Sequence, residues 1–337
     1  MSPNASSHQT DKQSLHYIVR SGIAGGVAGC VAKTVVAPLD RVKILFQASN
    51  PDFHKYAGSW SGAFGAGRQI FRENGMLGLF QGHSATLLRI FPYAAIKFMA
   101  YDQIEHILMP TQEYHTNARR FTAGAFSGMT SVFFTYPLEL IRVRMAFHTR
   151  STNHGQPSKP TFFLAASEIY REVPKPQVSA SNAPSTTIPP ALTAPSLFSR
   201  FPLLKFYRGF SVTLTGMIPY AGTSFLIWGF LRSHFAPSSA NPKRSSNPVL
   251  DLSAGAVSGA LSQTVSYPFE VIRRRMQVGG LTHPDRWMRW GETVSTIWRA
   301  GGWRGFYVGL SIGYLKIVPM TAVSFTVWQW GKGVLGV

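Results

Sequence analysis

Three stretches of this 337-residue chain align with one another without a gap, and this repetition restricts the fold more than any other feature. Each stretch contains Gly-x-x-x-Gly, a proline thirteen residues after the first glycine, an acid two residues after the proline and a base five residues after it. An apolar block with its own proline follows each stretch. The stretches cover residues 25–47, 124–146 and 255–277, and the blocks cover 89–102, 216–229 and 316–329. The chain therefore consists of three tandem units with two long apolar segments each.

Each apolar segment is long enough to cross a membrane, because a helix needs roughly 20 apolar residues to span the hydrocarbon core. The sequence therefore predicts an all-α membrane protein with six transmembrane helices. We expect residues 1–14 to be disordered, and we place repeat 1 at 15–110, repeat 2 at 115–235 and repeat 3 at 249–337. Repeat 2 contains an insertion rich in Pro, Ser, Ala and Thr at 174–196, which we expect to be a disordered loop because it has little to bury.

The composition limits the classes of function. Charged residues make up only 14% of the chain, yet the net charge is +19, which suits a nucleic acid, an anionic lipid or a polyanionic small molecule as partner. The basic residues recur at equivalent points of apolar repeats, which argues against nucleic acid. The single cysteine, Cys30, excludes an intrachain disulfide and a metal site built from cysteines. Because no nucleophile, metal-ligand cluster or acid–base dyad stands out, we expect neither catalysis nor a cofactor or bound metal.

The proline of each first stretch lies inside an apolar run of helix length, at Pro38, Pro137 and Pro268. Proline in a helix interior removes a backbone hydrogen bond and bends the helix, at a cost of about 3 kcal/mol or more. Three bends at equivalent positions would turn three helices towards a common axis. The acid and the base after each proline are three residues apart, so they share a helix face and both point to that axis.

Around a three-fold axis, the acid of each of these helices meets the base of the next, so that the ring leaves no charge unpaired. The expected pairs are Asp40 with Arg142, Glu139 with Arg273, and Glu270 with Lys43. Pairing matters because a lone charge at membrane depth costs roughly 2.5 to 3.5 kcal/mol. The alternative is a local surface pair within each helix, worth about 0.2 to 0.5 kcal/mol. Three copies tied to the same proline favour the ring.

The triplicated pattern resembles the signature of the mitochondrial carrier family, Pro-x-[Asp/Glu]-x-x-[Lys/Arg]-x-[Lys/Arg]. The signature is complete at 137–144 and 268–275, and the first copy departs from it only at Leu45, where the family has a base. The resemblance implies a six-helix bundle with three-fold pseudosymmetry in the inner mitochondrial membrane, with both termini towards the intermembrane space and cardiolipin as an anionic lipid partner. It also makes the charge ring the gate on the matrix side, braced by Gln47 and Gln277.

The family resemblance implies a second, cytoplasmic gate at the far end of the even-numbered helices. There the family has an aromatic residue, then an acid and, three residues later, a base. Only Asp102 and Arg232 remain as an ion pair of this type. Counted by pairs, the cytoplasmic gate is weaker than the matrix gate. We therefore expect a carrier without substrate to rest open towards the cytoplasmic side.

The resemblance also places substrate contacts three residues before the proline of each apolar block, near the middle of the membrane. These positions hold Arg89, the pair Gly216 and Met217, and Lys316, and two further lysines at spanning positions are Lys33 and Lys97. Two cations indicate an anion, and arginine suits bidentate contact with phosphate. Glycine followed by an aliphatic residue resembles the adenine slot of nucleotide carriers. For a single lysine, the alternative is a side chain that extends to the membrane interface.

These features predict an adenine-bearing polyphosphate as the substrate. The stretches 32–51 and 78–98 look most like those of coenzyme A carriers, so coenzyme A is the expected substrate. An adenine nucleotide carrier, of the ATP/ADP or ATP-Mg/phosphate type, is the alternative, although the stretch 273–278 lacks the three methionines of the ADP/ATP carrier signature. A proton-leak protein of the same fold is a further alternative.

Overall fold

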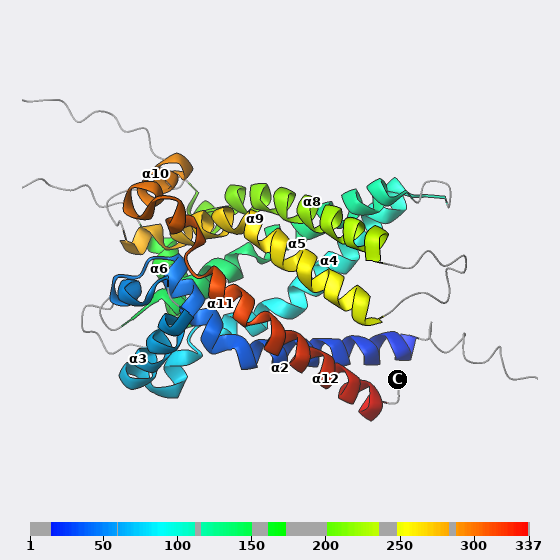
Figure 1. Ribbon diagram of the computed structural model, residues 1–337, viewed down its shortest axis with the longest axis horizontal. Coiled ribbons are helices and arrows are strands. Elements are labelled where there is room, and N and C mark those ends of the chain that lie inside the picture. The colour runs from blue at the N-terminus through cyan, green and yellow to red at the C-terminus, as the bar shows by residue number, and fades with distance from the viewer. Residues whose placement is uncertain are drawn as a thin grey trace, which may run out of the picture. The chain divides into compact units, whose positions relative to one another are not determined.

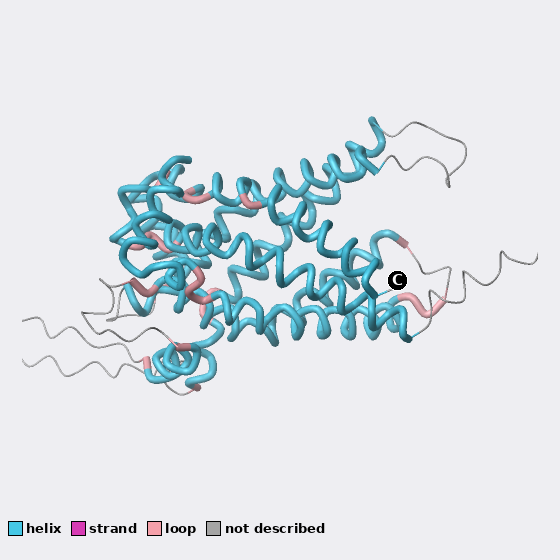
Figure 2. Tube along the Cα trace, turned by 90° about the horizontal axis from the view of Figure 1, so that it is seen from below, coloured by secondary structure: helices cyan, strands magenta, loops and turns pink. Residues whose placement is uncertain are grey.

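The computed structural model describes residues 15–58, 60–111, 116–149, 161–172, 201–235, 248–282 and 288–335. These residues form helices with short connections, and the described part of the chain contains no strand (Figure 2). The expected all-α class is therefore confirmed. The two segments expected to be disordered, 1–14 and 174–196, lie outside the described residues.

Each repeat contributes a long helix, a short helix and a second long stretch of helix (Figure 1). The long helices are α2 (Leu15–Gln47), α4 (His83–Leu108), α5 (Asn117–Phe147), α8 (Phe210–Phe235), α9 (Pro248–Thr282) and α12 (Ile317–Leu335), with α11 (Leu310–Leu315) directly before α12. The short elements are η2 (Pro51–Tyr56), α3 (Trp60–Leu79), α6 (Phe162–Arg171), η4 (Pro202–Tyr207), α10 (Trp290–Gly301) and η5 (Gly302–Tyr307). The order long, short, long follows from the repeated sequence pattern.

The described residues divide into two compact units. The first unit takes in the described residues of 1–43, 59–146 and 311–337. The second unit takes in those of 44–58 and 147–310. The first unit therefore contains most of α2 and α5, all of α3, α4 and α12, and the second contains α6, α8, α9 and α10.

In the first unit, two glycines allow α2 to lie close to other helices. A Cβ added at Gly26 would come within 2.9 Å of the ring of Phe91, so this glycine permits the approach of α4. A Cβ added at Gly331 would lie 3.2 Å from the Cβ of Ala24, and α2 and α12 run side by side (Figure 1). Small residues at such points allow backbones to approach closely.

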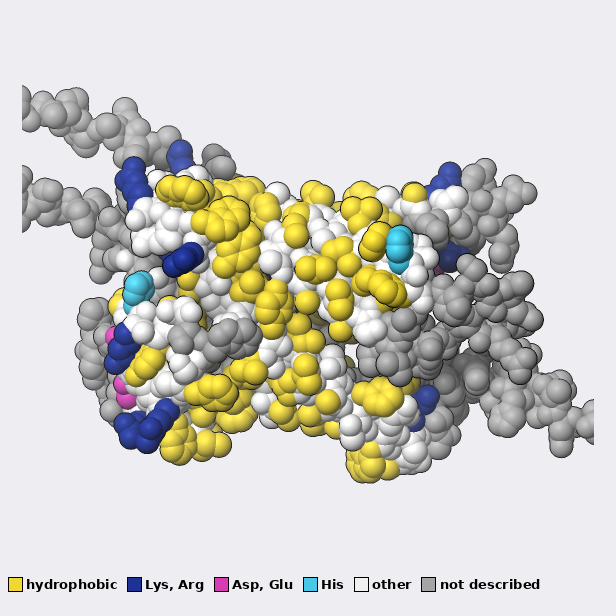
Figure 3. Space-filling view, viewed as in Figure 1, with side chains coloured by type: hydrophobic (Ala, Val, Ile, Leu, Met, Phe, Trp, Pro, Cys, Tyr) yellow, Lys and Arg dark blue, Asp and Glu magenta, His cyan; other side chains and the backbone are white. Residues whose placement is uncertain are grey.

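Three described segments could cross a membrane by length and composition: Arg20–Gln47, Pro202–Phe235 and Trp290–Val334. The other long helices, α4, α5 and α9, are of similar length but are not among the segments apolar enough to be counted here. On the face drawn in Figure 3, hydrophobic side chains cover much of the helical surface, and Lys and Arg gather near helix ends. On α2, exposed apolar residues recur every four positions, at Ile23, Val27, Val31 and Val35. Such a stripe suits contact with lipid.

The three prolines of the signature lie inside long helices, Pro38 in α2, Pro137 in α5 and Pro268 in α9. Helical backbone continues on both sides of each proline. Their placement within helices is therefore as expected, whereas the bend that each would cause stays a prediction.

The helices α4, α8 and α11 each begin after a glycine with a left-handed backbone conformation. The φ angle is 84° at Gly82, 78° at Gly209 and 85° at Gly309. A residue with a Cβ is strained in this region. At Gly82 a side chain would also lack room, because an added Cβ would lie 2.9 Å from the carbonyl oxygen of Arg142. These glycines let the chain turn from a short element into the next long helix.

The substitution Gly82→Ala is expected to lower the free energy of unfolding by about 1 to 3 kcal/mol, because alanine must adopt a positive φ. Thermal unfolding of the purified protein would show this as a lower midpoint. The matched control is Gly67→Ala in α3, where an added Cβ meets no described atom within 4 Å. There alanine is expected to be neutral or to stabilise by up to about 1 kcal/mol. Equal midpoints for the two variants would contradict this prediction.

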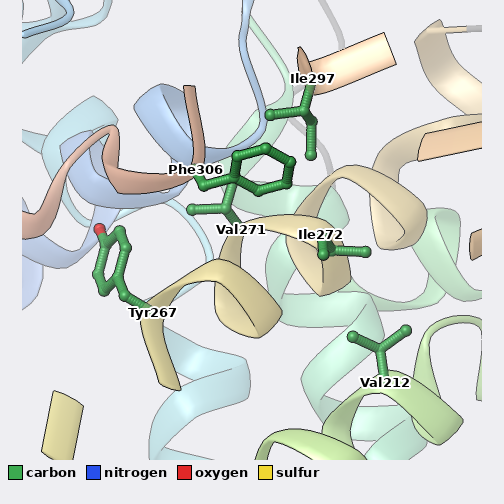
Figure 4. Close-up of a cluster of buried hydrophobic side chains, with 6 residues drawn as sticks. All are labelled: Val212, Tyr267, Val271, Ile272, Ile297 and Phe306. Carbon is green, nitrogen blue, oxygen red and sulfur yellow. The ribbon is translucent and has the colours of Figure 1, made fainter. Parts of the chain in front are cut away.

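In the second unit, α8 and α9 pack against each other, and a hydrophobic cluster joins α9 to α10 and η5. Its buried members are Val212, Tyr267, Val271, Ile272, Ile297 and Phe306 (Figure 4). The Tyr267 hydroxyl donates a hydrogen bond of 3.1 Å to the carbonyl of Val308, directly after η5. The cluster therefore holds the short elements of repeat 3 against α9.

Candidate functional site

Cations from two different repeats meet the carboxylate of Asp40 in the first unit. The Nη2 atom of Arg142 in α5 lies 3.0 Å from Oδ2 of Asp40, and Nζ of Lys316 lies 2.7 Å from Oδ1. Asp40 itself is only 7% exposed. Each carboxylate oxygen therefore has its own cation, and hydrogen bonds between charged groups are the strongest kind in proteins.

A second carboxylate in the same unit, that of Glu139, pairs with Arg89 of α4. The Nη1 atom of Arg89 lies 2.8 Å from Oε2 of Glu139, and Glu139 is 4% exposed. The Arg89 guanidinium also lies 5.6 Å from the ring centroid of Tyr93, within range of a cation–π contact. Arg89 is thus held on one side by a carboxylate and on the other by an aromatic ring.

Arg89 and Lys316 occupy equivalent positions, three residues before the proline of their apolar blocks. The helix of repeat 1 is continuous at this position, whereas that of repeat 3 is interrupted by a turn at Lys316, between α11 and α12. Backbone hydrogen bonds bridge the turn, from the Lys316 N–H to Ile312 (3.2 Å) and from the Met320 N–H to Lys316 (3.1 Å). The two long stretches therefore present their cations at corresponding points.

Lys33 of α2 adds positive charge to the same region. Its Nζ atom lies 3.5 Å from the sulfur of Met320 and within electrostatic range of Asp40 and Lys316. Lys97, by contrast, is exposed on α4. The structure therefore brings Lys33 to the other cations, while a substrate contact at Lys97 stays a prediction.

We refer to six residues of the first unit as the charge cluster. They are Lys33, Asp40, Arg89, Glu139, Arg142 and Lys316. Four cations and two carboxylates leave an excess of two positive charges, which attracts anions. Beside the cluster, Nε2 of His83 lies 2.9 Å from Oγ1 of Thr34. Within the described residues, no group of three or more His, Cys, Asp or Glu side chains could hold a metal ion.

One pair of the expected ring, Asp40 with Arg142, is present in the structure. The other two expected pairs, Glu139 with Arg273 and Glu270 with Lys43, each join residues assigned to different units, and they stay predictions. The contacts of Arg89 and Lys316 with the acids were not expected from the sequence. The two cations recur at one position of their repeats, but this recurrence does not indicate which acid each would contact.

Other predicted site residues lie in the second unit. A Cβ added at Gly216 of α8 would lie 2.9 Å from the Cβ of Phe269 in α9, so this glycine also permits helix packing. The Gln277 side chain accepts a hydrogen bond of 2.9 Å from Nη1 of Arg274. Gln47 is 1% exposed. The roles of Gly216 and Met217 in adenine binding, and of both glutamines as braces, stay predictions.

The predicted cytoplasmic gate also stays a prediction. Asp102 belongs to α4 of the first unit, whereas the side chain of Arg232 lies outside the described part of the structure. At the end of α12, Nζ of Lys332 lies 4.5 Å from the ring centroid of Trp328. In repeat 3, the aromatic residue and the base of the cytoplasmic-gate pattern therefore contact each other.

Arg41 is a buried cation whose importance sequence reasoning missed. It is 2% exposed, and its Nε donates a hydrogen bond of 3.3 Å to the carbonyl of Ala146 near the end of α5. Its Nη1 donates to the carbonyl of Gly78 near the end of α3. The equivalent positions hold Leu140 and Val271, so an alignment of the repeats could have singled out this extra charge.

Comparison with known proteins gives matches over almost the whole chain. A family model described as mitochondrial carrier protein matches residues 15–112, 113–173 and 244–336. An uncharacterized mitochondrial carrier of Schizosaccharomyces pombe is 44% identical over 99% of both chains. A mitochondrial carrier protein of Saccharomyces cerevisiae is 42% identical over 96% of this chain and 93% of its own. Solute carrier family 25 member 16 of Bos taurus is 38% identical over 93% of this chain and 88% of its own.

Proposed function

Because this chain belongs to the mitochondrial carrier family, whose members are solute transporters, we propose that it moves an adenine-bearing polyphosphate, with coenzyme A as first candidate. The family is one of multi-pass proteins of the inner mitochondrial membrane, and its members are transporters rather than enzymes. The proposed mechanism is alternating access, in which a site near the middle of the membrane opens to one side at a time. The observation that carries the proposal is the charge cluster.

The charge cluster supports an anionic substrate. Arg89 and Lys316 are buried in part, lie at equivalent points of two repeats and belong to a group with excess positive charge. Arginine binds phosphate through two parallel N–H groups, and lysine acts as a point charge. Coenzyme A offers a 3′-phosphate and a diphosphate to such cations, and an adenine to an apolar slot. The binding energy of these groups would offset the cost of opening a gate.

The adenine part of the proposal rests on family resemblance at Gly216 and Met217. In repeat 2 these residues replace the cation of the other two repeats, which leaves a small and apolar position. The same glycine permits the approach of Phe269, so a substitution there would disturb helix packing as well as binding. Arg89 and Lys316 are therefore the better residues for a test of substrate binding.

Purified full-length protein in liposomes is expected to take up labelled coenzyme A. Arg89→Ala and Lys316→Ala are each expected to reduce uptake by about tenfold or more, because a hydrogen bond to a charged group is worth about 1.5 to 3 kcal/mol. The matched control is Arg68→Ala, which removes an exposed cation from α3 and should leave uptake within about twofold. Undiminished uptake in both variants would contradict the site, and no uptake of coenzyme A would contradict the substrate.

The same liposomes distinguish the alternatives. An adenine nucleotide carrier would take up ATP or ADP in preference to coenzyme A. A proton-leak protein would dissipate a pH gradient without moving any nucleotide, which a trapped pH indicator reports. Coenzyme A uptake that excess ADP does not suppress would favour the coenzyme A assignment over both.

The remaining parts of the proposal concern the gates and the membrane. We propose that the signature residues form the matrix gate, that Asp102 and Arg232 close the cytoplasmic side, and that both termini face the intermembrane space. Because the cytoplasmic gate has fewer ion pairs, the carrier without substrate would rest open to that side. The net charge of +19 also favours anionic lipid, with cardiolipin as first candidate.

A further inference from the structure

The two carboxylates of the charge cluster contact the two cations that the proposed function assigns to the substrate. Nζ of Lys316 lies 2.7 Å from Asp40, and Nη1 of Arg89 lies 2.8 Å from Glu139. A phosphate group would need the same N–H donors. We propose that Asp40 and Glu139 are resident counter-ions of the substrate site, which an incoming polyanion displaces from Lys316 and Arg89. This inference rests on the proposed function for the class of substrate.

The geometry at Asp40 allows this exchange without loss of its contact to α5. Lys316 contacts the Oδ1 atom, whereas Arg142 contacts Oδ2. Lys316 can therefore turn to a phosphate while Arg142 stays on the same carboxylate. Asp40 then keeps its hydrogen bond to Arg142 but loses the one from Lys316, so occupation of the substrate site changes the charge balance at a residue of the signature.

The exchange also keeps Arg89 and Lys316 paired. Asp40 and Glu139 are almost fully buried, and a lone charge at membrane depth costs roughly 2.5 to 3.5 kcal/mol. Without substrate, the carboxylates stabilise Arg89 and Lys316, and with substrate the phosphates do so. The carboxylates therefore stabilise the state without substrate and compete with the polyanion for the same donors. Removal of one carboxylate should tighten substrate binding even where it slows transport.

Glu139→Gln is the sharper test of this competition, because it removes the charge and keeps the shape of the side chain. Calorimetric titration of the purified full chain with coenzyme A is expected to give a Kd about tenfold lower than that of the wild type, equivalent to about 1.4 kcal/mol. Asp52→Asn is the matched control, since the Asp52 carboxylate accepts a hydrogen bond from Thr149 in the second unit. It should leave the Kd within about twofold. Unchanged or weaker binding to Glu139→Gln would overturn the proposal.

A second measurement tests the Asp40 contact without any substrate. Cys30 is the only cysteine, so Cys30→Ser gives a cysteine-free chain in which Lys316→Cys can react with charged methanethiosulfonates. A carboxylate beside position 316 raises the reaction rate of the cationic reagent relative to that of the anionic one. Adding Asp40→Asn should shift the ratio of the two rates towards the anionic reagent by about fivefold or more. An unchanged ratio would overturn the assignment of Asp40 as the counter-ion of this site.

Inorganic pyrophosphate separates failure of this inference from failure of the proposed function. It carries the diphosphate of coenzyme A without the adenine. If Glu139→Gln binds pyrophosphate more tightly than the wild type while neither protein binds coenzyme A, the substrate assignment is wrong and the counter-ion role stands. If the wild type binds coenzyme A and Glu139→Gln binds neither ligand more tightly, the function stands and the counter-ion role is wrong. If no protein binds either ligand, both are wrong.

Discussion

Asp40→Asn is expected to reduce transport by about 100-fold or more, because it leaves two cations at membrane depth without their carboxylate, each at a cost of roughly 2.5 to 3.5 kcal/mol. Asp40 joins Arg142 and Lys316 through separate oxygens, so one substitution removes two ion pairs. Asparagine keeps the size of the side chain but can offer only one neutral acceptor oxygen. Labelled coenzyme A uptake into liposomes measures the loss, and calorimetric binding of coenzyme A shows whether the protein is still folded.

Two controls separate the charge of Asp40 from its position. Asp40→Glu keeps the carboxylate on a longer side chain, and we expect it to retain more uptake than Asp40→Asn. Asp52→Asn removes a carboxylate that contacts Thr149 in the second unit, and it should leave uptake within about twofold. If Asp40→Asn transports as fast as the wild type, Asp40 has no part in a gate.

Repetition is the reason why much of the fold was predictable from the sequence. Three copies of one pattern indicate the same helices three times, and α2, α5 and α9 indeed contain the prolines of the signature. The contact between Asp40 and Arg142 followed from the same reasoning, because a three-fold arrangement sets the acid of one repeat against the base of the next. A single copy would have supported only a local pair.

The contacts of Arg89 and Lys316 with the acids could not be predicted in the same way. Arg89 is 50 residues from Glu139, and Lys316 is 276 residues from Asp40. The sequence places each cation on its own helix but says nothing of the distance along the helix axis between substrate contact and signature. Long side chains cover that distance, since arginine and lysine carry their charge at the end of a flexible stem.

The glycines of α2 also show what a sequence pattern cannot predict about helix packing. A Gly-x-x-x-Gly pattern, such as Gly25 and Gly29 of α2, is typical of the place where one membrane helix packs closely against another. A Cβ on either residue would nevertheless meet no described atom within 4 Å. The close approach in the first unit occurs at Gly26, against Phe91. A pattern identifies a helix with small residues, whereas the face that meets a neighbour depends on how the helix is rotated about its axis.

Arg41→Leu is expected to lower the free energy of unfolding by about 2 to 5 kcal/mol, because it removes two hydrogen bonds from a charged donor, each worth about 1.5 to 3 kcal/mol. The buried carbonyl of Ala146 loses this donor, and that of Gly78 keeps the Gln81 N–H at 3.3 Å. The side chain is 2% exposed and donates to the carbonyls of Ala146 and Gly78. Both acceptors lie near the ends of helices, where carbonyl groups have no partner within their own helix. Thermal unfolding of the purified protein with and without the substitution measures the effect.

Leucine is the informative replacement, because repeats 2 and 3 have Leu140 and Val271 at the equivalent position, both fully buried. If the site needed only an apolar side chain of suitable size, Arg41→Leu would be neutral or stabilising, as replacement of buried charge by well-packed apolar groups often is. A large loss shows instead that repeat 1 depends on the guanidinium as a donor between α3 and α5. Arg41→Lys supplies a charge without the planar fork, so its free energy of unfolding should lie between those of the wild type and Arg41→Leu. Arg68→Ala is the control, at an exposed position of α3, and should leave the unfolding midpoint unchanged.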